Sequence, residues 1–300
     1  MLKTHYSKPA LSFQRQIQQL KARGLVIQNP QKALHLLQSI SYYRLSGYWY
    51  PLLANKEKHL FKPGAQFENC FKLYRFDREL RSTITSELEK IEIAVRAKII
   101  YNLSEQAGPF GYLSPAIYKK PQQFHDYLHP KLNEEYARSD EEFIRAFRIK
   151  YANPLPPSWM AMEIVSFGTL SRLFSYLKPG REKRGIANHF GLSESVFENW
   201  LHCMVYLRNI CAHHSRLWNR TLSIQPQLPL SPKRIFIQNK NVRSDRAYFV
   251  LVMIRYMLQT VNPKSDFVQK IKALLIKYSN VDPQAMGFPS NWEQEPFWQQ

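Results

Sequence analysis

The sequence predicts an all-α fold, in the form of a helical bundle with an N-terminal helical extension. Three observations support this prediction. Apolar residues recur every three or four positions over most of the 300 residues, which is the spacing of one helix face. Strand signals are few, and the apolar run AYFVLVMI at 247–254 lies inside a helical pattern. Aromatic residues make up 14% of the chain, which indicates a folded core rather than disorder.

The N-terminal extension is predicted to cover residues 1–65. One amphipathic helix is expected over 12–23, where Gly24 follows the last apolar position of the pattern. A second helical pattern follows over 31–45.

An aromatic cluster, SYYRLSGYWYPL at 41–52, closes the extension. One interpretation is a turn that packs its rings into the core. The other is a surface on which bases stack, because Tyr and Trp interleaved with Arg44 suit single-stranded nucleic acid. The sequence leaves both interpretations open.

Residues 66–300 are predicted to form the bundle as one compact unit. Its longest helical pattern runs from Gln66 to Gln106 without Pro or Gly, as one helix or two in line, and Glu92 and Arg96 form an i,i+4 pair on it. Loops are expected where Pro and Gly gather, at 108–115, 151–157 and 226–234. Further helices are expected over 121–136, 140–150, 158–177, 194–214, 245–260 and 264–279.

The charge of the chain favours a polyanionic partner. Lys and Arg number 42 against 23 Asp and Glu, which gives a net charge of +19. The basic residues are spread widely, which suits a phosphate backbone better than a small acidic substrate. The sequence contains no basic amphipathic segment with an isolated apolar face, so binding to a membrane surface is not predicted. No apolar run reaches the roughly 18 residues that a membrane-spanning helix needs.

The compartment is predicted from the cysteines and the N-terminus. Cys70, Cys203 and Cys211 are odd in number and include no CxxC pair, so a disulfide framework is not expected. The N-terminal stretch MLKTHYSKPALSFQRQ shows no secretion signal. We therefore expect a protein of the reducing cytoplasm.

The stretch RNICAHHSRLWNR at 208–220 contains the candidate metal-ligating and catalytic residues. Five candidate metal ligands lie within 13 residues, but most of them belong to one continuous helix, whose faces point apart, so neither a metal site nor another cofactor is expected. These five residues are His202, Cys203, Cys211, His213 and His214. A nucleotide-using enzyme is not predicted either, because no Gly-rich phosphate loop is present.

Acid–base chemistry explains the stretch better. Asn209 and His213 share a helix face, and the long side chain of Arg208 can flank the imidazole. An arginine can hold a phosphate while the histidine moves a proton, and RNA supplies its own 2′-OH nucleophile. The Arg–His spacing alone is weak, since Arg184 and His189 repeat it, there with a glycine after the arginine.

RNICAHHSRLWNR resembles the Arg-Asn-x-x-x-His motif of HEPN ribonucleases. Three further stretches resemble signatures of bacterial abortive-infection proteins of the AbiD/AbiF type and occur in the expected order, so that the resemblance covers most of the chain. They are SYYRLSGYWYPL (41–52), YRFDRELRSTITSELEKIEIAVRAKI (74–99) and PSWMAMEIVSFGTLSRLF (157–174).

The resemblance implies a HEPN-type helical bundle, metal-independent cleavage of RNA, and phage defence through growth arrest. It also implies a homodimer, because two such motifs usually face each other across an interface. Some members of the family are thought to work beside a small non-coding RNA, which the positive charge would accommodate. The alternative is a non-catalytic RNA-binding or scaffold protein with the same fold, and a DNA-binding regulator is a third hypothesis.

The resemblance also assigns roles to residues. Arg208, Asn209 and His213 match the catalytic motif, and His214 is an alternative to His213 because Arg-x5-His is also permitted. Possible supporting partners of the site, for which a structural ion pair is the other interpretation, are Glu92, Arg96 and Glu163. The residues expected to bind RNA are Arg216, Arg220, Arg44, Lys183 and Arg184.

Overall fold

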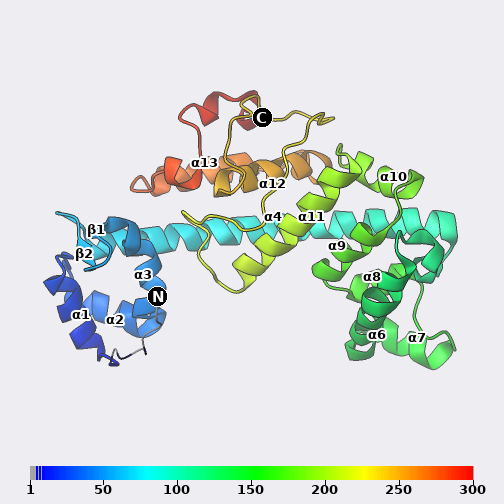
Figure 1. Ribbon diagram of the computed structural model, residues 1–300, viewed down its shortest axis with the longest axis horizontal. Helices are drawn as coiled ribbons and strands as arrows, with labels where there is room; N and C mark the ends of the chain where they lie inside the picture. Colours follow the sequence, from blue (N-terminus) through cyan, green and yellow to red (C-terminus); the bar gives the residue numbers. More distant parts are fainter. Residues whose placement is uncertain (1–4, 6, 8, 300) are drawn as a thin grey trace. The chain divides into compact units, whose positions relative to one another are not determined.

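The computed structural model describes residue 5, residue 7 and residues 9–299, and it confirms the all-α fold. Within the N-terminal stretch in which the sequence shows no secretion signal, residues 1–4, 6 and 8 lie outside the described residues. The chain folds into two compact units (Figure 1). The first unit is Met1–Leu80 with Ala273–Asp282, and the second unit is Arg81–Lys272 with Pro283–Gln300.

Short helices and one hairpin make up the first unit. Its elements are α1 (Phe13–Ala22), α2 (Pro30–Ile40), α3 (Tyr42–Trp49), the 3-10 turn η1 (Tyr50–Leu52), the strands β1 (Leu53–Asn55) and β2 (Leu60–Phe61), and the start of α4 (Phe67–Ala107). The two strands pair in antiparallel fashion, with Leu53 opposite Phe61. Apolar side chains from α1, α2, α3 and the hairpin form a shared core.

Capping side chains set the helix boundaries of the first unit. The Ser12 hydroxyl accepts the Arg15 N–H at 3.3 Å and begins α1, and Asn29 caps α2 in the same way at 2.9 Å. Ser41 has a φ of 74°, which ends α2, and its hydroxyl then caps α3. The predicted pattern over 31–45 is therefore two helices and not one.

The aromatic cluster is helix α3 rather than a turn. Its Leu45, Tyr48 and Trp49 are buried, and the Tyr48 hydroxyl donates to the buried Asp77 carboxylate at 2.6 Å. Tyr43 is 89% exposed, by contrast. One face of the cluster packs into the core, as the first interpretation expected, while the other face is open to solvent.

The second unit contains the remaining helices. They are the rest of α4, α5 (Pro121–Gln123), the π-helical turn η4 (Phe124–Leu128), α6 (His129–Arg138), α7 (Glu142–Lys150), α8 (Ser158–Ile164), α9 (Phe167–Tyr176), α10 (Arg181–His189), α11 (Glu194–Ala212), α12 (Ala247–Val261) and most of α13 (Phe267–Lys277). Single 3-10 turns occur at η2 (Gly111–Leu113), η3 (Pro115–Ile117), η5 (Gln284–Met286), η6 (Trp292–Gln294) and η7 (Pro296–Trp298).

Two long helices form the centre of the second unit. Helix α4 is a single helix of 41 residues, and its apolar positions from Ile84 to Ile99 are buried at a spacing of three and four. Helix α12 is buried along Ala247–Leu258, as its apolar sequence predicts. Nowhere in the described chain is a helix both long and apolar enough to span a membrane.

The helix predicted over 158–177 is broken into α8 and α9. The Ser166 hydroxyl accepts the Thr169 N–H at 3.1 Å, so Ser166 begins a new helix. The preceding carbonyl, of Val165, accepts a hydrogen bond from Arg96 Nη1 at 3.0 Å instead of one from its own helix. The continuous helix was a wrong prediction because a capping side chain and a distant arginine satisfy the backbone at this point.

All three cysteines are free and buried. Burial raises the pKa of the Cys203 thiol to about 12, and burial is also the main cause that raises the pKa of Cys70 to about 12. Both thiols therefore behave as small apolar side chains near neutral pH.

Candidate active site

Helix α11 positions the motif. Ser193 caps its first turn by accepting the Val196 N–H at 3.4 Å. One side of the helix is buried from Val196 to Cys211, which fixes the rotation of α11 in the second unit. This rotation leaves Asn209 exposed and Arg208 partly buried.

The end of α11 places both histidines. His213 is the C-cap residue, with a φ of −83° and a ψ of 9°, and its N–H donates to the Asn209 carbonyl at 3.0 Å. The N–H of His214 donates to the Cys211 carbonyl at 3.0 Å, and the N–H of Ser215 donates to the Ile210 carbonyl at 2.9 Å. These two bonds form a Schellman motif, which stops the helix and turns the chain away.

His214 has the left-handed conformation that the Schellman turn requires. Its φ is 54°, a value that glycine adopts most easily at this position of a helix end. A residue with a Cβ atom raises the free energy of such a turn by about 1 kcal/mol. The conformation strains His214, whereas His213 keeps a negative φ, of −83°.

Arg208 is a partly buried cation with an unused hydrogen-bond donor. Its Nε atom is buried and has no hydrogen-bond partner among the described residues. Throughout the described chain, no carboxylate lies within ion-pair distance of Arg208. An unsatisfied buried donor costs about 1–3 kcal/mol, so an incoming anionic oxygen would recover that cost.

The three motif side chains thus combine a cation, an amide and an imidazole at one helix end. Asn209 and His213 are both exposed and are four positions apart, so they share a face. The described residues make no side-chain hydrogen bond to either of them. The arrangement can bind a phosphate at Arg208 and exchange a proton at His213.

The second Arg–His pair of the sequence has different surroundings. Arg184 Nε lies 3.4 Å from the Glu194 carboxylate, which neutralises its charge. Gly185 packs so closely that a Cβ atom there would lie 3.1 Å from Asn102 Oδ1. Burial, and then the neighbouring Lys98 and Arg234, lowers the pKa of His189. Only the pair at the end of α11 combines an exposed histidine with an arginine that lacks a carboxylate partner.

The residues named as supporting partners lie elsewhere in the second unit. Glu92 and Arg96 form the predicted ion pair at 2.9 Å, and Arg96 also bonds to the Val165 carbonyl. Glu163 is exposed at the end of α8. Within the described residues, no hydrogen bond or ion pair joins these three side chains to Arg208, Asn209 or His213.

The residues named for RNA binding differ in their exposure. Arg216 and Arg220 directly follow the helix end, where Arg220 Nη1 donates to the Arg216 carbonyl at 3.3 Å. Arg44 is exposed on α3 of the first unit, and the side chain of Arg184 is 65% exposed. Lys183 is only 3% exposed, so it is not accessible to RNA in this structure.

Lys183 instead holds helix ends together. Its Nζ atom lies 2.6 Å from the Glu198 carboxylate and 3.4 Å from the carbonyls of Ser175 and Leu177. The expectation that Lys183 binds RNA is therefore corrected, because its charge is used inside the fold. A basic cluster in the sequence could not reveal this, since the partner carboxylate lies 15 residues further on.

A polar cavity that the sequence analysis did not identify lies along the same face of α11. It has a volume of about 570 Å³ and lies where α9 packs against α11. His202 lines it, seven positions before Asn209 and therefore on the same helix face. Its other lining residues include Lys131, Thr169, Arg172, Ser175 and Glu198. The spacing of His202 and Asn209 was the signal that could have indicated it.

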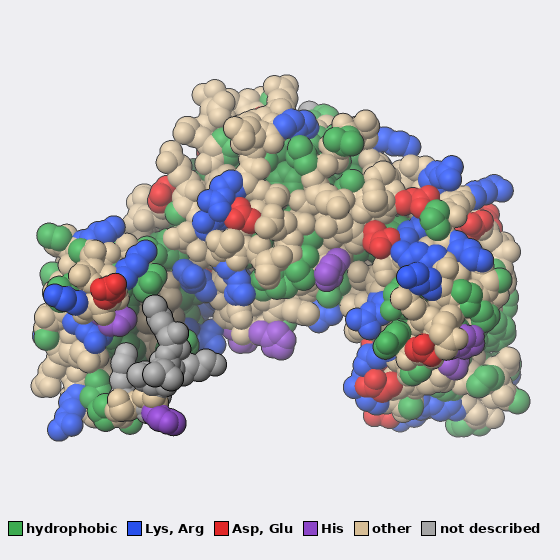
Figure 2. All heavy atoms as spheres, in the orientation of Figure 1, with side chains coloured by type: hydrophobic (Ala, Val, Ile, Leu, Met, Phe, Trp, Pro, Cys, Tyr) green, Lys and Arg blue, Asp and Glu red, His purple; other side chains and the backbone are tan. Residues whose placement is uncertain are grey.

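The charge balance of this cavity favours an anion. Arg172 brings positive charge, whereas Lys131 is paired with Glu134 at 2.8 Å. The Glu198 charge is compensated by Lys183 at 2.6 Å and Lys119 at 3.8 Å. Lys and Arg side chains also lie on the surfaces of both units, where they outnumber acidic ones (Figure 2). Among the described residues no carboxylate lies within ion-pair distance of Arg172, so the cavity keeps a positive charge.

Comparison with known proteins identifies a family. The family model described as Abi-like protein matches residues 35–219, which is more than half of the chain and includes the motif up to Asn219. No curated protein and no solved structure matches this chain.

Replacing Lys183 by Ala is expected to lower the free energy of unfolding by about 2 kcal/mol, because it leaves Glu198 and two carbonyls without their buried partner. RNA affinity is expected to stay unchanged. Denaturant unfolding and fluorescence anisotropy measure the two quantities, with exposed Arg184→Ala as the neighbouring control for stability. Unchanged stability with weaker RNA binding would contradict the structural role of Lys183.

Position 214 tests the geometry of the helix end. Because φ at His214 is 54°, the His214→Gly protein is expected to be more stable than the His214→Ala protein by about 1 kcal/mol. Both variants remove the imidazole, so their difference isolates the backbone conformation. Thermal and denaturant unfolding of the pair measure it, and equal stabilities would show that the left-handed turn is not formed in solution.

Proposed function

This chain belongs to the Abi-like protein family, and on that premise we propose that it is an abortive-infection protein that acts as a metal-independent endoribonuclease of the HEPN type. We assign it to the AbiD/AbiF type within that family. Its substrate is cytoplasmic RNA. The single observation that supports this activity best is that the last turns of α11 hold both a partly buried Arg208, whose Nε has no hydrogen-bond partner among the described residues, and the exposed His213.

The proposed reaction uses the RNA as its own nucleophile. The ribose 2′-OH attacks the adjacent phosphorus, and the bond from phosphorus to the 5′-oxygen of the next nucleotide breaks. His213 moves a proton in this exchange, either from the attacking hydroxyl or to the leaving oxygen. The products are a 2′,3′-cyclic phosphate and a free 5′-hydroxyl.

Arg208 stabilises the charge that develops on the phosphorane. Its Nε–H is buried and has no partner among the described residues, so it can donate to a phosphate oxygen once the side chain changes its rotamer. Removal from water then strengthens that hydrogen bond. Asn209, on the same face as His213, positions the strand with its amide. A fully solvated arginine would be a weaker choice, since its donors would already be bonded to water.

The RNA strand continues along the polar cavity of α11. Two turns separate His202 from Asn209, which corresponds to about 10 Å along the helix axis. Arg172 lines this cavity and is available to a flanking phosphate, and Lys131, which is paired with Glu134 at 2.8 Å, can exchange that carboxylate for a phosphate. Arg216 and Arg220 lie on the other side of the motif in the sequence and contact the strand there.

Substitution of the motif tests the activity. Arg208→Ala and His213→Ala are each expected to abolish cleavage of total bacterial RNA and of tRNA in EDTA, while RNA binding and thermal stability stay close to those of the unchanged protein. His214→Gly and Arg184→Ala are expected to retain cleavage. Mapping of the cut ends should find 2′,3′-cyclic phosphates only with the active proteins.

Several outcomes would revise the assignment. Full activity of His213→Ala would move the role to His214 or to the pair on α10. Loss of activity in EDTA with recovery on added zinc would contradict the metal-independent mechanism. RNA that copurifies with a protein unable to cleave it would favour the non-catalytic RNA-binding alternative, and that RNA can be sequenced.

We also propose that the active form is a homodimer in which two motifs face each other. The exposure of Asn209 and His213 on the surface of one chain supports this, because a second copy can approach them. Light scattering of the purified chain is expected to give twice the mass of one chain. A monomer with full cleavage activity would show that one motif suffices.

A further inference from the structure

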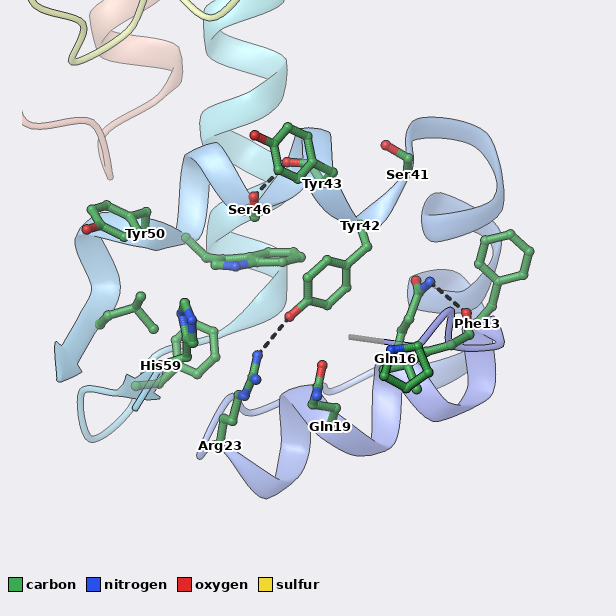
Figure 3. Close-up of a pocket in the computed structure, with 15 residues that line it drawn as sticks. Phe13, Gln16, Gln19, Arg23, Ser41, Tyr42, Tyr43, Ser46, Tyr50 and His59 are labelled. Carbon is green, nitrogen blue, oxygen red and sulfur yellow. Dashed lines mark hydrogen bonds between the residues drawn. The ribbon is translucent and has the colours of Figure 1, made fainter. Parts of the chain in front are cut away.

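A second cavity lies inside the first unit, between α1, α3 and the β1–β2 hairpin. Its volume is about 880 Å³, within the size range of small-ligand sites. Figure 3 shows that α1 supplies Phe13, Gln16 and Gln19 to it, while Tyr42 projects from α3 on the opposite side. His59 approaches from the hairpin (Figure 3).

Aromatic side chains dominate this cavity and several of them are unusually exposed. Tyr43 is 89% exposed, Tyr50 48% and Phe13 39%. The Tyr43 ring has no aromatic partner among the described residues, so its faces are open. Exposed rings that gather in one place mark a binding surface rather than the general exterior of a folded chain.

The inner wall of the cavity is rigid. Tyr42 and Trp49 meet edge to face, with ring centroids 5.0 Å apart. Arg23 Nη1 donates to the Tyr42 hydroxyl at 3.1 Å, and Trp49 is 4% exposed and packs against Phe67. A ligand that enters therefore meets aromatic rings that are already held in place, which reduces the entropy cost of binding.

Polar groups at the edge of the rings suit a heterocycle. The lining includes the amides of Gln16 and Gln19, the Arg23 guanidinium and the His59 imidazole. Gln16 Nε2 donates to the Leu11 carbonyl at 3.1 Å, while its buried Oε1 accepts no hydrogen bond from the part of the chain that the structure describes. A purely apolar ligand, such as a lipid tail, would leave these donors and acceptors unsatisfied.

The positive charge around the cavity favours a polyanionic ligand. Residues 1–80 contain 13 Lys and Arg against four Asp and Glu. The lining itself contains Arg23 and His59 and no carboxylate. Positive charge combined with open aromatic rings is the combination by which proteins bind single strands, through phosphates and stacked bases.

We propose that this cavity of the first unit binds an unpaired base of an RNA strand. The base stacks on the aromatic wall, its polar edge meets Gln16 or Gln19, and the phosphates lie on the basic surface around the opening. The inference takes RNA as the ligand from the proposed function, but it does not depend on cleavage. An apolar peptide is the competing occupant, and the surrounding charge disfavours it.

A binding experiment with matched oligonucleotides tests the base pocket. The probes are a short, labelled 2′-O-methyl oligouridine and an abasic oligonucleotide of the same length and charge. The 2′-O-methyl group removes the nucleophile, so binding is measured whether or not the protein cleaves RNA. Fluorescence anisotropy with the full chain is expected to give roughly 5- to 100-fold weaker binding of the abasic probe.

Variants then assign the difference to this cavity. Tyr43→Ala and Tyr50→Ala change exposed rings and are expected to keep the fold. Each should weaken binding of the oligouridine several-fold and leave binding of the abasic probe unchanged. Tyr127→Ala is the matched control, because Tyr127 is 59% exposed and belongs to the second unit.

The possible results separate the two proposals. Equal binding of both probes, or equal weakening of both by the tyrosine variants, would overturn the base pocket and leave the nuclease assignment untouched. Failure of the intact protein to bind either probe would overturn the base pocket as well. Loss of cleavage without loss of the base-dependent difference in the Arg208→Ala protein would support the pocket independently of catalysis.

Discussion

The candidate site depends on where α11 ends. The bonds from His214 to Cys211 and from Ser215 to Ile210 stop the helix directly after the motif. A helix that continued would place residues 216 and 217 beside His213, since positions three and four apart are neighbours on a helix surface. Because the chain turns at His214 instead, His213 is exposed while Arg208 stays partly buried in the preceding turns. The His213 imidazole is therefore open to solvent, whereas the Arg208 guanidinium is partly removed from it.

Local features of the sequence predicted the helices that surround this site. They did not predict the contacts between side chains that lie far apart in the sequence. The start of α11 at Ser193, its buried side and the unbroken length of α4 follow from capping residues and from apolar spacing. The break between α8 and α9 depends on Arg96, which lies 69 residues from the carbonyl that it binds. The burial of Lys183 likewise depends on Glu198 in another helix. A pattern of neighbouring residues contains no information about such pairs.

Residues that look equivalent in the sequence have different surroundings in the structure, both in the two Arg–His pairs and in the aromatic cluster. The Arg–His pairs at 184–189 and 208–213 have the same spacing, yet Arg184 has a carboxylate partner, Glu194, and Arg208 has none among the described residues. The aromatic cluster at 41–52 is one run of letters, but helix periodicity directs Tyr48 and Trp49 into the core and leaves Tyr43 in solvent. In both cases the rotation of a helix, and not the composition, decides what each side chain can do.

Two separate costs to stability coincide at the end of α11. The left-handed conformation of His214 costs about 1 kcal/mol relative to glycine, and the unpaired Nε of Arg208 costs about 1–3 kcal/mol. A glycine at 214 and an acceptor near Arg208 would remove both costs. Backbone strain clusters at functional sites, and here the strained residue and the unsatisfied donor lie within seven positions of each other. In the proposed reaction, a phosphorane oxygen at Arg208 would satisfy the donor, so the defect that weakens the free protein would stabilise the transition state more than the bound RNA.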